Sequence, residues 1–233
     1  VALAFELGCD AVLLNTAGGL TGGDRIDIKV ALAEATEATV TTAAAEKIYR
    51  ARDGEAAAIR VELHVAARAQ LAWLPQPTIV FDQSRLGRRT DVELAQDSSF
   101  LAVEALVFGR AAMGEHVRRG AVRDVWRVRR GGKLIFADTF LVEGAVAEAL
   151  GRPATLDGAR AAATVLYVAP DAAARVGEAR AILQEADGVS GASAFDGMLV
   201  VRALAEESRG LQALLARLVE KLSGRPLPRV WQC

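Results

Sequence analysis

The chain has 233 residues, and its 28 basic residues nearly balance its 29 acidic ones. A dedicated nucleic-acid-binding protein usually carries a basic surplus, so this balance argues against that class. Apolar residues make up 52% of the chain and charged residues 24%, which is typical of a globular protein and not of a disordered one. No apolar stretch reaches the ~18 residues that a membrane-spanning helix needs, so we expect no membrane association.

The few cysteines and histidines exclude further classes of protein. Cys9 and Cys233 form no CxxC pair, which fits a reducing compartment, although the sequence leaves a bridge between them open. His64 and His116 belong to no HExxH or similar pattern, and no GxSxG element is present. A structural zinc site and an ordinary hydrolase are therefore not expected. No leader sequence is visible at Val1, so we expect a cytoplasmic protein.

The first two thirds of the chain have the pattern of short β-strands. The segment Ile59–Val65 alternates apolar and polar residues and predicts a half-buried strand with His64 on its polar face. Glycine, proline and aspartate between the strands, Gly87 among them, predict turns. The predicted strands are Ala11–Leu14, Arg25–Leu32, Thr36–Thr42, Ile59–Val65, Ala69–Leu74, Thr78–Phe81, Thr90–Leu94, Phe100–Phe108, Val122–Val128 and Lys133–Val142.

The last third changes character. A strand over Ala162–Val168 precedes a helix that Asp171 is placed to cap and that runs to about Glu185. Asp196-Gly197 is a hairpin-turn signal between strands at Ser193–Phe195 and Met198–Ala203. A leucine stripe over Leu211–Leu222 predicts a helix ended by Gly224, packed on the core or, as the minority alternative, binding a partner.

These elements predict a mainly β fold built as a sandwich, a barrel or stacked sheets. We divide it into a β-rich body over residues 1–150 and a small α/β layer with two helices over residues 151–233, packed on that body.

The segment Asn15–Asp24 contains four glycines, which allow positive φ and close backbone approach. It has neither a GxxxxGK[ST] nor a GxGxxG pattern, so a nucleotide cradle is disfavoured. Tight turns between strands remain one interpretation. A specialised loop that places Asn15, Thr21 and Asp24 at a site or interface is the other.

Further segments carry chemically useful side chains. Thr41–Arg50 offers Glu46, Lys47 and Tyr49, and Leu74–Asp82 ends on a carboxylate. Phe108–His116 combines a thioether, a carboxylate and an imidazole, a set suited to a divalent metal such as nickel, but strand neighbours point to opposite faces. In the fifth segment, Arg118–Arg130, three arginines (Arg123, Arg127 and Arg129) share one strand face, which is either solvated or a docking surface for an acidic partner or RNA.

Four of these strings, taken in order, resemble the motifs of the urease accessory protein family UreD, also called UreH. They are Asn15–Asp24, Thr41–Arg50, Leu74–Asp82 and Gly109–Glu115, and the closing Pro228-Arg229-Val230-Trp231 is also similar to the family's end. Ala43, Pro77 and Ala111 depart from the residues that the family often has there.

The resemblance implies a non-enzymatic chaperone with a β-helix-like stack of short-stranded sheets. Proteins of this family associate with the urease apoprotein, with UreF and, through UreF, with the GTPase UreG, and a homodimer can form through that complex. The complex inserts nickel into urease, so the implied cofactor is transient, weakly bound nickel with nothing tightly bound.

Two sets of candidate residues follow from the motif segments. The candidate nickel or passage contacts are Asp24, Glu46, Asp82, Glu104, Glu115 and His116. The candidate partner or passage residues are Asn15, Thr21, Gly22, Gly23, Lys47, Tyr49, Arg110 and Met113. Two alternatives stay open: a hydrolase using Asp24, Glu115 and a histidine, and a plain structural module whose glycines serve only as turns.

Overall fold

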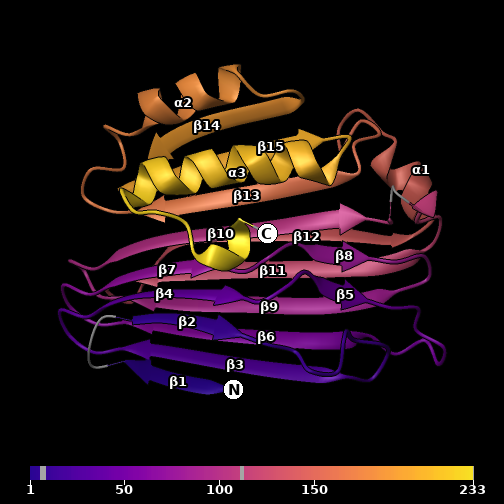
Figure 1. The fold of residues 1–233 in the computed structure, drawn as a ribbon, viewed down its shortest axis with the longest axis horizontal. Coiled ribbons are helices and arrows are strands. Elements are labelled where there is room, and N and C mark those ends of the chain that lie inside the picture. Colours follow the sequence, from indigo (N-terminus) through magenta and orange to yellow (C-terminus); the bar gives the residue numbers. More distant parts are fainter. Residues whose placement is uncertain (6–8, 111–112, 233) are drawn as a thin grey trace.

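The computed structural model describes residues 1–5, 9–110 and 113–232, in which the chain winds back and forth between two stacked sheets (Figure 1). In spatial order, the first sheet contains β1 (Ala2–Phe5), β3 (Arg25–Leu32), β6 (Ala57–Val65), β9 (Arg85–Leu94), β11 (Gly120–Arg130) and β12 (Lys133–Gly144). The second contains β14 (Val189–Phe195), β15 (Met198–Ala205), β13 (Ala161–Val168), β10 (Ser99–Phe108), β7 (Gln70–Leu74), β4 (Glu37–Thr42) and β2 (Cys9–Leu13). Two short strands, β5 (Glu46–Ile48) and β8 (Thr78–Val80), extend the second sheet beside β10.

The strands from β1 to β11 in the first sheet, and from β2 to β10 in the second, run parallel. Their register places like residues in rows, and Val30, Leu63, Val92 and Val128 form one fully buried row. This β-solenoid-like stacking confirms the expected fold class. The alternating pattern of each strand explains the stacking, because one face of every strand fills the space between the sheets.

The strands after residue 150 continue the second sheet. β13 pairs antiparallel with β10, and β15 and β14 follow it outward. Asp196 and Gly197 join β14 to β15 with φ values of 49° and 73°, the positive values that a type I′ hairpin turn requires. The predicted hairpin is therefore confirmed, and strands from both sides of residue 150 share one sheet.

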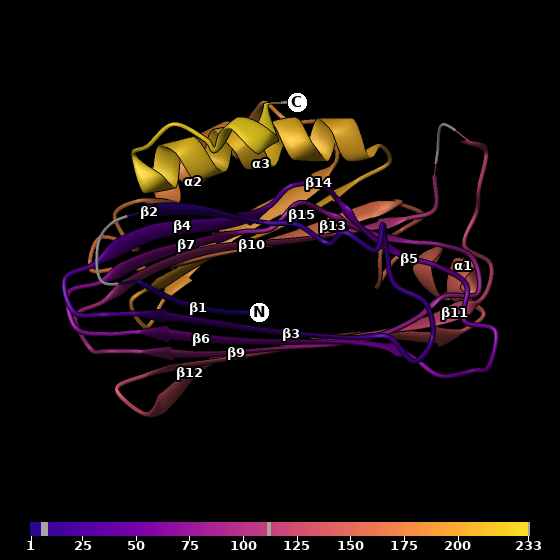
Figure 2. The same ribbon diagram turned by 60° about the horizontal axis from the view of Figure 1, so that its bottom comes forward.

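Two helices, α2 (Val176–Gln184) and α3 (Ser208–Ser223), cover the outer face of the second sheet (Figure 2). The predicted leucine stripe of α3 is buried, and Gly224 ends the helix with φ 66°. The chain closes with a 3-10 helix over Arg229–Trp231. One apolar core thus lies between the sheets and a second lies between the second sheet and the helices.

Several local predictions are wrong or incomplete. Gly87 lies inside β9 and not in a turn, because parallel neighbours pair with it on both sides. Asp171 does not cap α2, which begins at Val176; its carboxylate accepts hydrogen bonds from Tyr167 and Arg175. The strands β1 and β5 and a short helix, α1 (Val146–Leu150), were not predicted, since three to five residues carry too little periodicity.

Within the described part of the chain, no helix is both long and apolar enough to cross a membrane. Cys9 is exposed, and Cys233 and Ala111 lie outside the described residues.

We expect Leu215→Asp to destabilise the protein by several kcal/mol, because Leu215 is 1% exposed and an aspartate there is buried without a partner. Thermal unfolding and far-UV circular dichroism measure the effect. The matched control is Ala213→Asp on the exposed face of the same helix, which should unfold near the wild-type temperature. Equal stability of the two variants would contradict this packing.

Candidate functional site at one end of the solenoid

The four motif segments all lie at the same end of the molecule. Each one connects a strand of the second sheet to the next strand of the first sheet: β2 to β3, β4 to β6, β7 to β9, and β10 to β11. In a coil of parallel strands, connections of one kind must stack above one another. We call this set of loops the motif end.

Backbone hydrogen bonds tie the successive loops together. The Leu20 N–H donates to the Lys47 carbonyl, and the Tyr49 N–H donates back to the Leu20 carbonyl, both at 2.7 Å. The next loops join in the same way, since the Phe81 N–H donates to the Ile48 carbonyl and the Gly109 N–H to the Val80 carbonyl. A buried row of Leu20, Ile48, Val80 and Phe108 lies beneath these bonds. The motif end is therefore a small additional ladder and not a set of independent turns.

Two glycines of the first motif have no room for a side chain. A Cβ on Gly19, whose φ is 148°, would lie 2.5 Å from Cε2 of Tyr49. A Cβ on Gly22 would lie 2.7 Å from the Glu55 carbonyl oxygen. Gly18 and Gly23 also have positive φ, which confirms the predicted backbone role of this segment.

An open cavity of about 880 Å³ lies at the motif end. All four motif segments and the chain that follows the second contribute to its lining, which consists of Thr21, Gly22, Tyr49, Arg50, Arg52, Asp53, Phe81, Asp82 and Glu115. Beside the cavity, the rings of Tyr49 and Phe81 meet edge to face with centroids 4.9 Å apart, and the guanidinium of Arg110 lies 4.5 Å from the Phe81 ring centroid. Aromatic and arginine side chains of this kind are enriched at protein interfaces.

Two of the predicted carboxylates meet in this cavity. Asp82 accepts hydrogen bonds from the backbone N–H groups of Arg118 and Arg119 at 2.7 and 3.0 Å. Partial burial acts to raise the pKa of Asp82, but these bonds outweigh it and hold the pKa below its usual range. Glu115 pairs with Arg110 at 2.7 Å and accepts a long hydrogen bond of 3.4 Å from the Asp82 N–H.

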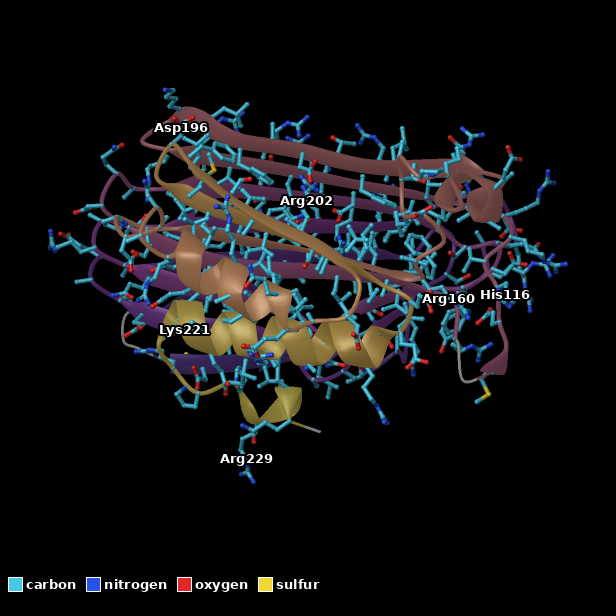
Figure 3. All side chains as sticks on the ribbon, turned by 90° about the horizontal axis from the view of Figure 1, so that it is seen from above. His116, Arg160, Asp196, Arg202, Lys221 and Arg229 are labelled. Atoms are coloured by element: carbon cyan, nitrogen blue, oxygen red, sulfur yellow. The ribbon has the colours of Figure 1, made fainter. Side chains whose placement is uncertain are left out.

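Of the other predicted residues, Thr21, Gly22 and Tyr49 also line this cavity. The remaining predicted residues of the motif end lie outside it. The Asn15 amide donates to the Glu46 carboxylate at 3.1 Å, and the Asp24 carboxylate accepts from the Thr21 N–H at 2.8 Å. Met113 is 75% exposed. His116 and Lys47 are also exposed, and Figure 3 shows His116 at this end of the molecule, near Arg160.

The alternative catalytic set is not assembled in the described residues. Neither Asp24 nor a histidine lines the cavity that holds Glu115, and His64 lies on the solvent face of β6, as its alternation predicted. Over residues 1–5, 9–110 and 113–232, no three His, Cys, Asp or Glu side chains are placed to hold a metal ion. On the predicted arginine face, Arg123 is exposed, Arg129 approaches Glu93 and Arg127 donates to backbone carbonyls.

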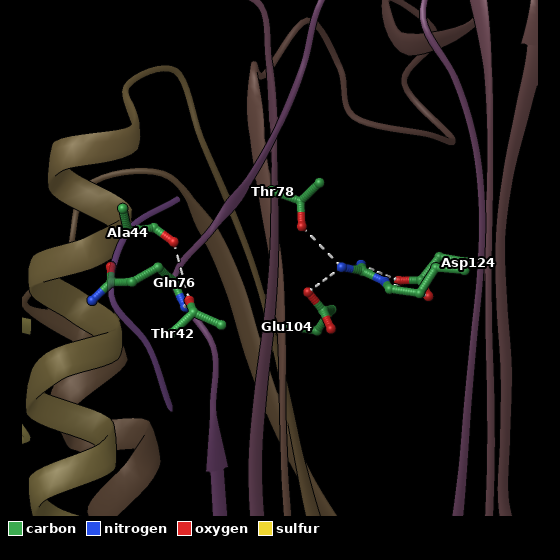
Figure 4. Close-up of polar contacts among 7 residues, drawn as sticks. Thr42, Ala44, Gln76, Thr78, Glu104 and Asp124 are labelled. Carbon is green, nitrogen blue, oxygen red and sulfur yellow. Dashed lines mark hydrogen bonds and ion pairs between the residues drawn. The ribbon is translucent and has the colours of Figure 1, made fainter. Parts of the chain in front are cut away.

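The third motif also anchors the chain's C-terminal end. Gln76 donates through its side chain to the Val230 carbonyl and accepts a hydrogen bond from Gln212 of α3, both at 2.9 Å. The Trp231 indole N–H reaches the Thr41 hydroxyl and the Leu74 carbonyl at 3.2 and 3.1 Å. Figure 4 shows Gln76 beside Thr42, whose hydroxyl accepts from the Gln76 N–H. The closing residues thus dock on the second and third motifs.

The prediction of Glu104 as a nickel or passage contact at the motif end is wrong. Glu104 is buried between the two sheets in an ion cluster (Figure 4). Arg88 of β9 donates to both oxygens of Asp124 at 3.0 and 2.6 Å and to the Thr78 hydroxyl at 2.9 Å. Its Nη1 lies 2.5 Å from Oε1 of Glu104, without hydrogen-bond alignment. We call Arg88, Glu104 and Asp124 the buried triad.

Sequence reasoning missed two members of this triad. Arg88 shares the buried parity of Leu86, Thr90 and Val92, but the predicted strand began only at Thr90. Asp124 falls between Val122 and Trp126 on the buried face of β11, and this position was the available signal.

Burial raises the pKa of Glu104 to about 8, with the charge of Asp124 adding to the effect and Arg88 opposing it. Burial alone would lower the pKa of Arg88, but the two carboxylates outweigh it and raise it. The triad therefore holds one proton on Glu104 at neutral pH and carries no net charge.

The raised pKa of Glu104 predicts how the stability of the folded protein depends on pH. The folded protein keeps the Glu104 proton up to about pH 8, whereas the unfolded chain releases it near the ordinary value of 4.5. Since the folded state binds more protons in this window, the free energy of unfolding contributed by Glu104 falls as pH rises from about 4.5 to 8. Denaturant titrations at several pH values should show a flatter dependence for Glu104→Gln. The exposed control Glu206→Gln should keep the wild-type slope, and an unchanged slope in Glu104→Gln would contradict the assignment.

A two-sheet solenoid whose connecting loops line one cavity defines a mainly β protein. Comparison with known proteins identifies the class further. The family model for the UreD urease accessory protein matches residues 4–232. The chain is 50% identical over 228 residues to the urease accessory protein UreD of Methylobacterium sp. (strain 4-46), covering 96% of this chain and 80% of that one.

Two further relatives agree. The urease accessory protein UreD of Azorhizobium caulinodans is 50% identical over 222 residues, with 95% of this chain and 82% of the relative covered. That of Rhizobium leguminosarum bv. trifolii is 47% identical over 228 residues, with 97% and 82% covered. The chain belongs to the UreD family of urease accessory proteins.

Proposed function

We propose that this protein is a urease maturation factor without turnover of its own, which acts with UreF and the GTPase UreG in delivering nickel to the urease apoprotein. Membership of the UreD family supports a role in urease maturation. The proposed role in nickel delivery with these partners is supported mainly by the assembly of all four motif segments at one end of the solenoid.

The motif end has the composition of a docking surface. Tyr49, Phe81 and Arg110 form a packed aromatic and guanidinium cluster, and Arg50 and Arg52 line the adjoining cavity. Such side chains supply much of the binding energy at the centre of protein interfaces. We therefore propose that UreF or urease contacts this end of the molecule.

We propose that nickel passes the motif end as cargo, touching Asp82 and Glu115. Both carboxylates line the same cavity, and the lowered pKa of Asp82 keeps it ionised at neutral pH. Two oxygen ligands without a soft donor exchange an ion readily, which suits delivery more than storage. Glu104 is excluded from this role because it is paired with Arg88 inside the core.

Calorimetry with nickel should give a dissociation constant of about 1 μM or weaker, as expected for few hard ligands. We expect Glu115→Gln and Asp82→Asn to weaken binding several-fold, and the exposed control Glu206→Gln to leave it unchanged. Nanomolar binding that survives the loss of both carboxylates would contradict this part of the proposal.

Deleting the gene in its host should lower both urease activity and the nickel content of purified urease under nickel-limited growth. Wild-type protein should restore both. Arg52→Glu, which reverses a charge in the cavity lining, should restore them less well than Lys133→Glu at the opposite end of the solenoid. Normal nickel content in the deletion strain would refute the proposed function.

A further inference from the structure

The outer face of the first sheet is open to solvent. Helices α2 and α3 both lie on the second sheet, and neither covers the outer face of the first (Figure 2). Strands β3, β6, β9 and β11 are neighbours in this sheet, and alternate residues of each strand point outward. We call the outward-pointing side chains of these four strands the basic face.

Positive charge predominates on the basic face. Its basic side chains are Arg25, Lys29, Arg60, Arg85, Arg89, Arg123, Arg127 and Arg129, and its acidic ones are Asp27, Glu62, Asp91 and Glu93. This face therefore has an excess of four positive charges, although the whole chain has a net charge of −1. Three of its four carboxylates already have a basic partner on the same face, in the pairs Glu62–Lys29, Asp91–Arg89 and Glu93–Arg129.

Three arginines of this face have no such partner. Arg25, Arg60 and Arg123 are exposed and form neither an ion pair nor a side-chain hydrogen bond with the described residues. Asp27 is the one carboxylate of the basic face that is not paired there, and it is the register partner of Arg60. More guanidinium groups than carboxylates are therefore free, so the charge left to be balanced on this face is positive.

The free arginines border a shallow gap. Arg25, Ala58, Gly87 and Arg123 are register partners in one row across β3, β6, β9 and β11. Since neighbouring strands are about 4.8 Å apart, the two arginines at the ends of the row stand about 14 Å apart. Only the methyl group of Ala58 and the hydrogen of Gly87 lie between them. Arg60 follows Ala58 by two residues on the same face, so arginines border this gap on three sides.

The fold itself does not require a glycine at position 87. Gly87 is not among the glycines with positive φ. A Cβ there would lie 4.0 Å from its nearest neighbour, the Ala57 carbonyl oxygen, which is an ordinary contact. A glycine inside a strand weakens the strand and often marks a place where a ligand or another backbone approaches closely. No other part of the described chain approaches Gly87 more closely, so the gap is available to another molecule.

We propose that the basic face docks an acidic segment of a protein partner, with one carboxylate side chain of that segment in the gap over Ala58 and Gly87. The guanidinium groups of Arg25, Arg60 and Arg123 would donate hydrogen bonds to it, because the planar fork of arginine matches the two oxygens of a carboxylate. Charge complementarity of this kind steers association and fixes the orientation of the partner.

The same face is less suited to nucleic acid. Its four carboxylates are distributed among the basic side chains, and Asp27 lies in the row next to the gap. The phosphates of a nucleic acid form a dense line of negative charge that would meet these carboxylates. A peptide with a few separated carboxylates avoids this repulsion.

The basic face adjoins the motif end. Arg25 and Arg85 are the first residues of β3 and β9, and motif loops lead directly into both strands. The inference rests on the proposed function in one respect, since it gives a chemistry to the partner that is proposed to dock at the motif end. Its test uses the purified full chain without urease or nickel, so a failure of peptide binding leaves nickel delivery standing.

The probe is a dye-labelled hexaglutamate peptide with capped termini, measured by fluorescence anisotropy at about 0.01 M salt. We expect it to bind at least about tenfold more tightly than hexaglutamine, and several-fold more weakly at about 0.1 M salt, where exposed charges are screened. Equal binding of hexaglutamine would overturn the inference. Tighter binding of an oligothymidylate or of phosphatidylserine vesicles than of hexaglutamate would also overturn it, by assigning the face to nucleic acid or to a membrane.

Two variants locate the binding. Arg25→Gln combined with Arg123→Gln should weaken hexaglutamate binding about fivefold, whereas Arg209→Gln combined with Lys221→Gln, on α3, should leave it unchanged.

Gly87→Val fills the gap without changing the charge. It should weaken peptide binding several-fold while the thermal unfolding temperature stays the same or rises, because valine favours strands. The matched control is Gly191→Val on β14, where a Cβ also meets no neighbour, and it should bind the peptide like wild type. Unchanged binding in the double arginine variant would overturn the inference, and this variant keeps the test decisive if Gly87→Val folds poorly.

Discussion

Hydrogen bonding between parallel strands in register determines where every loop of this protein lies. Each turn of the coil places one strand in each sheet, so all connections from the second sheet to the first stack at the same end. The loop from β2 to β3 is therefore a neighbour of the loop from β4 to β6, although the bridge partners Leu20 and Ile48 are 28 residues apart in the chain. Four motifs that are far apart in the sequence line one cavity because parallel strand pairing stacks the loops that contain them.

The buried triad lies inside this ladder. Arg88 and Asp124 are direct register partners on the neighbouring strands β9 and β11, and Glu104 faces them from the other sheet. Such a cluster is expensive to desolvate, and removing one partner leaves a buried charge unpaired. A shift of one residue in β9 or β11 would turn Arg88 or Asp124 to the solvent face and separate them, so the pairing disfavours wrong registers.

The two sheets end differently, and the difference creates a second cavity. The first sheet finishes with the antiparallel strand β12, whereas the second continues through β13, β15 and β14 and is covered by α2 and α3. A cavity of about 590 Å³ with apolar, aromatic and ion-paired side chains in its walls lies at this open edge. The molecule thus has two separate cavities, one built from stacked loops and one built from the unequal extension of its sheets.

The sequence by itself determined most of the longer strands and their faces, since the alternation in Ile59–Val65, the Asp196-Gly197 turn and the leucine stripe of α3 are local patterns. It also indicated the family, because four ordered motifs are visible without any coordinates. Only the tertiary structure decided which residues meet. Asp82 with Glu115, Trp231 with Thr41, and Arg88 with Glu104 and Asp124 are contacts across sheets and turns. The geometry of these contacts depends on the register between strands that are far apart in the chain, and a local sequence pattern does not specify that register.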